Sequence, residues 1–192
     1  MPAFRTGRVV ELIEERPGLQ RVRVTLDEGP GSGAERAYCL SELTGPVAVG
    51  DAVVLNTTAV DLGLGTGGWH VVHCNLDRPA FRRAGPDHVM KLRYTSLQFD
   101  AGTDELRHPD LPERLDGTPV VACQVHSQVA AVAAAFATVA PGRRLGYVMT
   151  DGASLPIALS DLVAGLVERG LLAATVTAGH AFGGELEAVT VH

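Results

Sequence analysis

The sequence lacks the features of a nucleic-acid coat or a membrane protein. Its 192 residues carry 16 basic and 22 acidic side chains, a net charge of −6, whereas polyanions and membrane surfaces attract basic faces. Aromatic residues make up only 5%, and no strip of them suited to base stacking stands out. No apolar run approaches the about 20 residues of a membrane span. We therefore expect neither a membrane nor a nucleic acid as partner.

Cysteine is also scarce, and no secretory leader precedes the first strand pattern. The three cysteines, Cys39, Cys74 and Cys123, are odd in number, far apart, and form no CxxC pair. Such cysteines are most often buried, reduced thiols, and reduced thiols are typical of a cytosol. Residues 1–5 lack the apolar region of a signal peptide. These absences predict a cytoplasmic protein.

The first part of the chain has the pattern of a small β domain. The composition is globular, with 46% hydrophobic residues and with 22 Gly and 11 Pro dispersed as turn residues. Residues 20–26 alternate cleanly, with Val22, Val24 and Leu26 on one face. Short strands separated by such turns predict a β-barrel-like domain over residues 1–76. The expected strands are 7–13, 20–26, 36–43, 52–60 and 69–74.

A connecting strand and a polar linker are predicted over residues 77–117. Residues 89–95 alternate, so that Lys91 and Arg93 share one strand face. Two cations on one face can bind a carboxylate or a phosphate, which makes this pair a candidate anion site. The alternative is a solvated strand edge with no ligand.

Residues 118–192 have the pattern of a parallel βαβαβ unit. The apolar run at 120–125 indicates a strand covered on both faces. Ser127 can cap a first helix with one apolar stripe, and Asp151 or Ser154 can cap a second. The remaining strands are expected at 145–149, 174–177 and 187–191.

The predicted fold class is therefore α/β, and α+β for the whole chain. A small N-terminal β-barrel-like domain precedes a parallel βαβαβ unit of three layers. The last predicted strand has no helix after it to cover its face. We therefore expect the natural fold to continue and the α/β unit to be incomplete at its C-terminus.

Chemically capable side chains follow three of the predicted parallel strands, namely His126, Asp151 and His180. Ligands bind beyond the carboxyl ends of such strands, and right-handed crossovers bring these ends to one edge. The three can bind a divalent metal, or act as a general acid and base with an orienting carboxylate. Ser127 and Ser154, at helix N-termini, would add donors for an anion. Alternatively, Ser127, Asp151 and Ser154 are only caps, and His126 bonds to backbone.

Two other patterns favour structure over chemistry. His70 and His73 lie on opposite faces if residues 69–74 form a strand, which argues against shared metal ligation. The glycine run at 63–68 precedes a strand, not a helix, and no GK[ST] follows it. A hairpin turn or loop is therefore the expected role of these glycines.

Five segments together resemble a known family: GTGGWH at 65–70, MKLRYT at 90–95, VHSQ at 125–128, MTDGASLP at 149–156 and AGHAFGGELEAV at 178–189. In this order, over nearly the whole chain, they resemble the bacterial family named domain of unknown function 3866. The resemblance implies a bacterial cytoplasmic protein and brings no activity, cofactor or catalytic residue. It also implies longer members that continue into further α/β structure.

Two functions remain open from the residues. The first is a metal- or anion-dependent enzyme of hydrolase or transferase type, acting on a small molecule. Its site would use His126, Asp151 and His180, with Lys91 or Arg93 as an anion contact. The second is a non-catalytic ligand-binding or regulatory module in which the histidines are structural. A homo-oligomer is compatible with either function.

Overall fold

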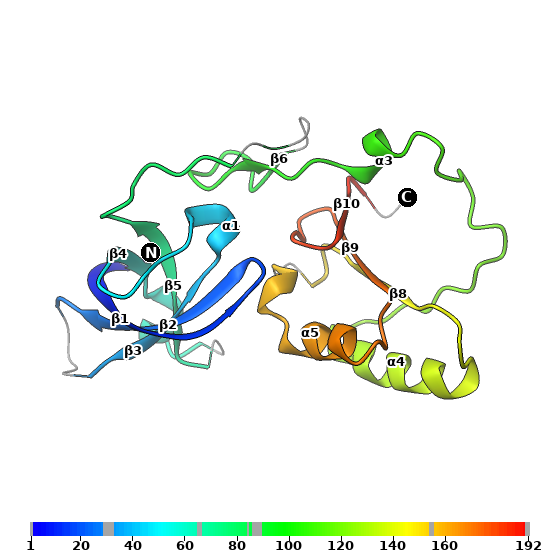
Figure 1. Ribbon diagram of the computed structural model, residues 1–192, viewed down its shortest axis with the longest axis horizontal. Helices are drawn as coiled ribbons and strands as arrows, with labels where there is room; N and C mark the ends of the chain where they lie inside the picture. The colour runs from blue at the N-terminus through cyan, green and yellow to red at the C-terminus, as the bar shows by residue number, and fades with distance from the viewer. Residues whose placement is uncertain are drawn as a thin grey trace. The chain divides into compact units, whose positions relative to one another are not determined.

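The structure is a computed structural model that describes residues 2–28, 33–64, 67–83, 85, 90–153 and 156–190. The chain forms two compact units, unit 1 (Met1–Arg83) and unit 2 (Ala84–His192). Figure 1 shows a barrel in unit 1 and a sheet with helices in unit 2. The segment 77–117, expected as a connection, is therefore divided between the units.

Unit 1 is a closed five-stranded barrel. Its elements are β1 (Phe4–Arg16), β2 (Leu19–Leu26), β3 (Glu35–Cys39), α1 (Ser41–Thr44), β4 (Ala52–Asn56), α2 (Thr58–Asp61) and β5 (Trp69–Asn75). The strand order is β1-β2-β3-β5-β4, and β3 pairs with β5 in parallel while the other pairs are antiparallel. This order is the topology of the OB-fold, a five-stranded Greek-key barrel. The predicted β-barrel is confirmed.

Side chains of the barrel alternate between its interior and its outer surface. On β2, Val22 and Val24 are buried, whereas Arg23 between them is exposed. The interior cluster comprises Val9, Val22, Val24, Ala37, Cys39, Val47, Val53, Leu55 and Val72. The strands expected at 36–43 and 52–60 are shorter than predicted, because the chain turns into α1 and α2.

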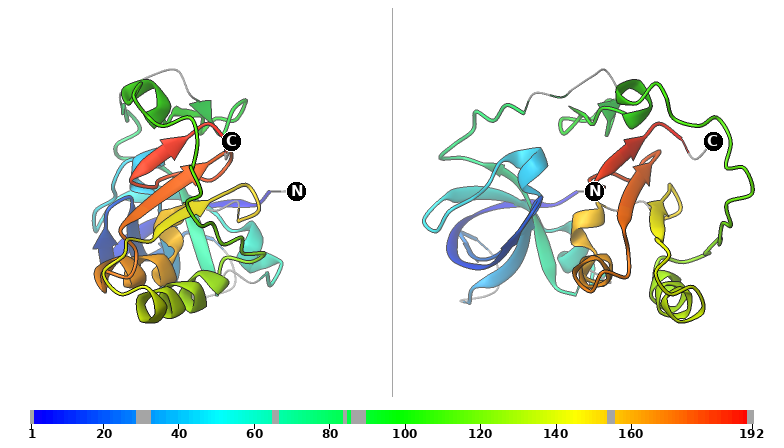
Figure 2. Two further views of the ribbon diagram at one scale, coloured as in Figure 1. Left: turned by 90° about the vertical axis from the view of Figure 1, so that its right-hand side faces the viewer. Right: turned by 45° about the vertical axis from the view of Figure 1, so that its right-hand side comes forward.

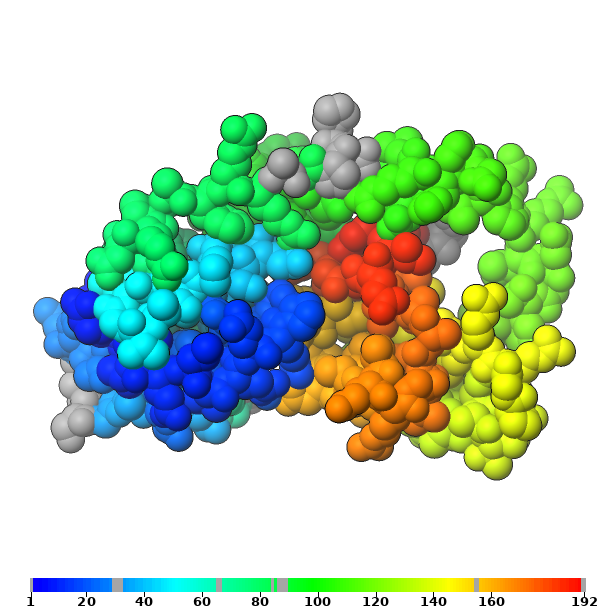
Figure 3. Space-filling model, in the orientation of Figure 1, coloured from blue at the N-terminus to red at the C-terminus, as the bar shows by residue number. Residues whose placement is uncertain are grey.

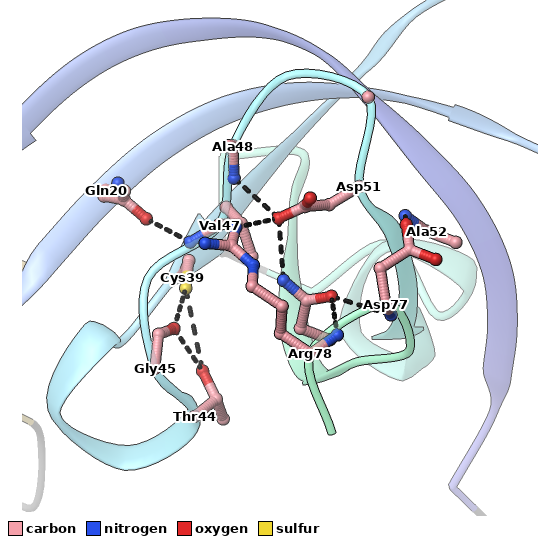
Figure 4. A network of polar contacts seen from close by, with 12 residues as sticks. Gln20, Cys39, Thr44, Gly45, Val47, Ala48, Asp51, Ala52, Asp77 and Arg78 are labelled. Carbon is pink, nitrogen blue, oxygen red and sulfur yellow. Dashed lines mark hydrogen bonds and ion pairs between the residues drawn. The ribbon is translucent and has the colours of Figure 1, made fainter. Parts of the chain in front are cut away.

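A polar network holds the loop before β4 against the end of β5 (Figure 4). The Asp51 carboxylate accepts hydrogen bonds from the Ala48 N–H at 2.8 Å and the Asn75 amide at 2.7 Å, and it pairs with Arg78. Burial alone raises the pKa of Asp51, but the hydrogen bonds and the Arg78 charge outweigh it and lower this pKa below 3.8. The fold therefore stabilises the ionised carboxylate.

Replacing Asp51 by Ala should destabilise unit 1 by about 2 kcal/mol, because the amide of buried Asn75, the Ala48 N–H and Arg78 all lose their acceptor. Since the folded pKa lies below the ordinary 3.8, the carboxylate contribution is complete above 3.8 and decreases as pH falls below it. Denaturant unfolding at pH 7 and pH 3 measures both effects. Asp27→Ala, at an exposed carboxylate, is the control, and equal losses for the two variants would contradict the network's role.

The cysteines are free thiols that differ in exposure. Cys39 is buried in the barrel, Cys74 is half-buried and Cys123 is exposed. Burial raises the pKa of Cys39, whose Sγ donates a hydrogen bond to the Gly45 carbonyl (Figure 4). The expectation of buried thiols is therefore correct for Cys39 and wrong for Cys123.

Unit 2 contains a parallel three-stranded sheet. Its elements are β6 (Met90–Lys91), β7 (Phe99–Asp100), α3 (Asp104–Arg107), α4 (Gln128–Val139), β8 (Gly146–Met149), the 3-10 helix η1 (Ile157–Leu159), α5 (Asp161–Glu168), β9 (Ala174–Ala178) and β10 (Leu186–Ala188). The strand order is β10-β9-β8, and these strands lie side by side in Figures 1 and 2. The core is Val129, Ala133, Met149, Ile157, Val163, Leu166, Leu172 and Ala181.

The expected βαβαβ unit is present only in part. β8, α5 and β9 form one βαβ, but residues 120–125 are not a strand, and Val120 is 73% exposed. An apolar run becomes a strand only when a neighbour completes its hydrogen bonds, and within the described residues no strand pairs with this one. The prediction of a first parallel strand at 120–125 is therefore wrong.

The three predicted layers are also reduced. α4 and α5 share one core cluster with Met149, whereas Val148 and Leu186, which point to the other sheet face, are 49% and 39% exposed. Figure 3 shows α4 in yellow-green on the surface, where it buries only Val129 and Ala133.

Among the described residues, no helix is long and apolar enough to cross a membrane.

Two local predictions differ from the structure. Residue 89 of the strand expected at 89–95 lies outside the described residues, and of residues 90–95 only Met90–Lys91 is a strand, because Leu92 turns the chain with a φ of +51°. Lys91 is buried and Arg93 exposed, so they do not share a strand face. The second helix begins later than expected, and its cap is Ser160, not Asp151. Ser154 lies outside the described residues.

Candidate functional site

The site is centred on His126, which lies two residues before the start of α4 at Gln128. Its Nδ1 lies 2.8 Å from the Tyr147 hydroxyl, and its Nε2 lies 2.7 Å from the Ser160 hydroxyl. Tyr147 belongs to β8, and Ser160 is the residue before α5. Three segments far apart in the sequence thus place a hydroxyl on each imidazole nitrogen.

Ser160 occupies the N-terminus of α5. Its Oγ accepts a hydrogen bond from the Val163 N–H at 3.1 Å, which is a helix cap, and the residue is 8% exposed. The same oxygen contacts the imidazole of His126. When Nδ1 of His126 carries the proton, its N–H donates a hydrogen bond to the Tyr147 oxygen. Nε2 then accepts a hydrogen bond from the Ser160 hydroxyl, so both ring nitrogens have a partner. In this tautomer the imidazole can remove the Ser160 proton.

Burial sets the protonation states of the ring groups. It lowers the pKa of His126 below 6.5, so the neutral imidazole predominates at neutral pH. The pKa of Tyr147 is raised above 10.0, first by burial and to a lesser extent by the nearby Cys123, so this side chain remains a neutral phenol. A neutral base, a neutral phenol and an aliphatic hydroxyl therefore form one chain of hydrogen bonds.

Asp151 and His180 meet at the ends of β8 and β9. The Asp151 carboxylate accepts a hydrogen bond from the His180 backbone N–H. Gly179 permits this approach, because it has a φ of +65° and its missing Cβ would lie 2.0 Å from Asp151 Oδ1. The His180 side chain is exposed. Asp151 thus fixes the turn that carries His180.

The predicted trio of His126, Asp151 and His180 is brought together only in part. Asp151 contacts His180, while the imidazole of His126 contacts Tyr147 and Ser160. Among the residues that the structure describes, no three His, Cys, Asp or Glu side chains are arranged to hold a metal ion. A metal-binding role for this trio stays a prediction.

The predicted anion contacts have other environments. Lys91 Nζ lies 2.7 Å from Glu187 Oε2 and donates to the Ala181 carbonyl, so its charge is already neutralised inside unit 2. Asp104 of α3 also contacts this ion pair's strand, because its Oδ2 accepts a hydrogen bond from the Glu187 N–H at 2.6 Å. Ser127 is exposed and makes no capping hydrogen bond through its side chain.

Tyr147 and Ser160 were missed by reasoning from the sequence. Ser160 carried a usable signal, because a serine before an acidic residue and an apolar stripe at Leu162, Val163 and Leu166 is a typical helix start. The contact of Tyr147 with His126 has no local signal, because the two residues are 21 positions apart and belong to different elements.

The fold and site define a two-unit α+β protein, with an OB-type barrel followed by a partial parallel α/β unit that carries a His–Ser–Tyr cluster. The family described as "Protein of unknown function (DUF3866)" matches residues 36–192, most of the chain. The chain belongs to this family, as its sequence segments indicated. No curated protein and no solved structure matches the chain.

Proposed function

We propose that the protein is an enzyme of the hydrolase or transferase type that transfers an acyl group of a small ester. Ser160 is the nucleophile and His126 the general base. The observation that carries this proposal is the 2.7 Å contact between His126 Nε2 and Ser160 Oγ, with the other ring nitrogen held by Tyr147 at 2.8 Å. Enzymes that use a hydroxyl as nucleophile activate it in this way, with a base in hydrogen-bond contact and a third group that orients the base.

The reaction proceeds in two balanced steps. Ser160 Oγ attacks the ester carbonyl while His126 Nε2 takes its proton, and the proton then passes to the departing alcohol as the ester bond breaks. In the second step a water molecule gives a proton to His126 and attacks the acyl-serine. The carboxylic acid leaves, and Ser160 Oγ regains the proton from His126.

The surroundings of Ser160 favour the charges of this reaction. Ser160 Oγ lies at the N-terminus of α5, where the Val163 N–H donates to it and the helix dipole favours negative charge. Tyr147 accepts the Nδ1–H of His126 and so fixes the ring as Nε2 becomes protonated. His180, exposed at the end of β9, is proposed as a substrate contact.

The test uses p-nitrophenyl acetate as substrate and a fluorophosphonate probe as label. Ser160→Asn keeps a capping oxygen at the start of α5 and removes the nucleophile. It should lower the hydrolysis rate at least about a thousandfold and abolish the label. Ser127→Ala, at an exposed serine of the same unit, is the control and should behave as the parent chain.

The pH profile gives a second readout. Because the base must be neutral and the pKa of His126 lies below 6.5, activity should be constant above 6.5 and fall at more acidic pH. His126→Ala should remove this acid limb and lose activity to the same extent as Ser160→Asn. An unlabelled parent chain, or a label unaffected by Ser160→Asn, would sink the proposal.

The alternative is a non-catalytic ligand-binding module. It is favoured by the contacts of the predicted trio. His126 bonds to Tyr147 and Ser160, and Asp151 bonds to the backbone of His180, so these side chains have structural partners within the fold. A chain that binds ligands through its barrel but never hydrolyses the ester or reacts with the probe would support this alternative.

A further inference from the structure

The outer face of β2, β3 and β5 carries a stack of aromatic and arginine side chains. Tyr38 and Trp69 lie ring on ring, with centroids 4.5 Å apart and planes inclined by 15°. The Arg36 guanidinium carbon lies 4.8 Å from the Trp69 ring centroid, and that of Arg21 lies 5.7 Å from both ring centroids. Neither ring is buried, so the stack stands at the barrel surface.

The strand register explains why these side chains share one face. Arg36 is opposite Trp69 across the parallel pair, and Arg21 is opposite Tyr38 across the antiparallel pair. The intervening Ala37 and His70 point into the barrel. Three strands thus contribute two planar rings and two planar cations to one outward surface.

Glycines bring the preceding loop close to this surface. Gly67 and Gly68 have φ values of +65° and +75°, and the Gly67 carbonyl accepts a hydrogen bond from Arg36 at 2.6 Å. A Cβ at Gly68 would lie 3.4 Å from the Arg36 guanidinium. Gly67 and Gly68 therefore help to hold Arg36 over Trp69, which is a more specific role than a simple turn.

The charge of the barrel differs from that of the whole chain. Residues 1–83 contain nine arginines, no lysine and ten acidic residues, so the acidic excess lies almost entirely in residues 84–192. Arg21 pairs with Glu14 at 2.6 Å and Arg23 with Glu11 at 2.9 Å. Arg36 instead donates a hydrogen bond to a backbone carbonyl, and no carboxylate of the described residues forms an ion pair with it.

We infer that this face binds single-stranded nucleic acid, with a base stacked on the Tyr38–Trp69 pair and the backbone phosphate held by Arg36. Base stacking on aromatic rings beside arginine is how single strands are bound without sequence preference. The OB-type barrel offers the equivalent strands to extended ligands. The low aromatic content and net charge that argued against nucleic acid describe the whole chain, not this face.

Trp69 is the only tryptophan, so its intrinsic fluorescence reports directly on the proposed site. The 192-residue chain is titrated with a dT oligonucleotide and its rU equivalent at 50 mM salt, and binding is followed by Trp69 quenching and by the anisotropy of a labelled oligonucleotide. Quenching should accompany binding, and affinity should fall with salt. A duplex of the same length should bind at least tenfold more weakly, because its base faces are occupied.

Tyr38→Leu and Arg36→Ala should each lower the affinity about tenfold or more. Arg5→Ala is the control, because Arg5 is also a barrel arginine, is paired with Asp61, and belongs to β1. The Arg5→Ala variant should bind the oligonucleotide as tightly as the parent chain does. Circular dichroism checks that each variant is folded. The inference is overturned if the oligonucleotide changes neither signal, if duplex binds as tightly as single strands, or if Arg5→Ala weakens binding as much as Arg36→Ala.

Discussion

Lys91→Met should destabilise unit 2 by about 3–5 kcal/mol, the cost of leaving one partner of a buried ion pair without the other. The Lys91 and Glu187 side chains are 4% and 12% exposed, and their charged atoms lie 2.7 Å apart. The Glu187 carboxylate also accepts the Gly183 N–H, so it cannot turn toward solvent without losing a second bond. Denaturant unfolding followed by circular dichroism measures the loss.

Two variants separate the ion pair from other effects of the substitution. Arg93→Met removes an exposed cation two residues away and should change the stability by less than about 0.5 kcal/mol. Adding Glu187→Gln to Lys91→Met removes the isolated charge and should restore most of the stability. A small loss for Lys91→Met, equal to that of Arg93→Met, would show that the pair is not buried in solution.

Lys91 also supplies its own probe, since it is the only lysine in the chain. An amine-reactive reagent should modify it slowly in the folded chain and quickly after unfolding. Mass spectrometry of the modified peptide then follows the opening of unit 2 independently of the barrel. This readout connects the stability change to the unit that contains the pair.

Gly179→Ala should cost about 2–5 kcal/mol, because two penalties add. A φ of +65° is unfavourable for any residue with a Cβ, and that Cβ would meet Asp151 Oδ1 at 2.0 Å. Asp151 must then move and release the His180 N–H, a loss of about 1–3 kcal/mol. The same shift displaces His180, so any activity that depends on this turn should also fall.

Gly170→Ala is the matched control, because Gly170 has a φ of +67° and nothing within 4 Å of its Cβ position. It should cost only about 1–2 kcal/mol for the backbone conformation. Combining Gly179→Ala with Asp151→Ala removes the collision, and the added cost of Gly179→Ala should fall to the Gly170→Ala value. Equal single costs for Gly179 and Gly170 would contradict the Asp151 contact.

Local patterns predicted much of the fold. The alternation of residues 20–26 predicted β2, and the apolar stripe after Ser127 predicted α4 at Gln128–Val139. The five short strands of the barrel were expected, although two are shorter than predicted. The run at 120–125 shows the limit, because its composition suits a buried strand and yet no described strand pairs with it.

The candidate site was predicted in part. His126 was identified from its position after an expected strand, but its partners Tyr147 and Ser160 were not. Lys91 was a candidate anion contact, with a solvated strand edge as the alternative, and the structure gives it the partner Glu187, 96 residues away. No spacing rule connects such positions, because the folded chain between them sets their distance.

The sequence by itself determined the barrel's alternating strands, the two apolar helix stripes and the family membership, since each depends on periods or segments within a few residues. Only the tertiary structure decided that Lys91 is neutralised, that Ser160 contacts His126, and that Tyr38 stacks on Trp69. These contacts arise when strands and helices pair across long loops, and the hydrogen bonds and buried area of that pairing are not encoded in any local pattern.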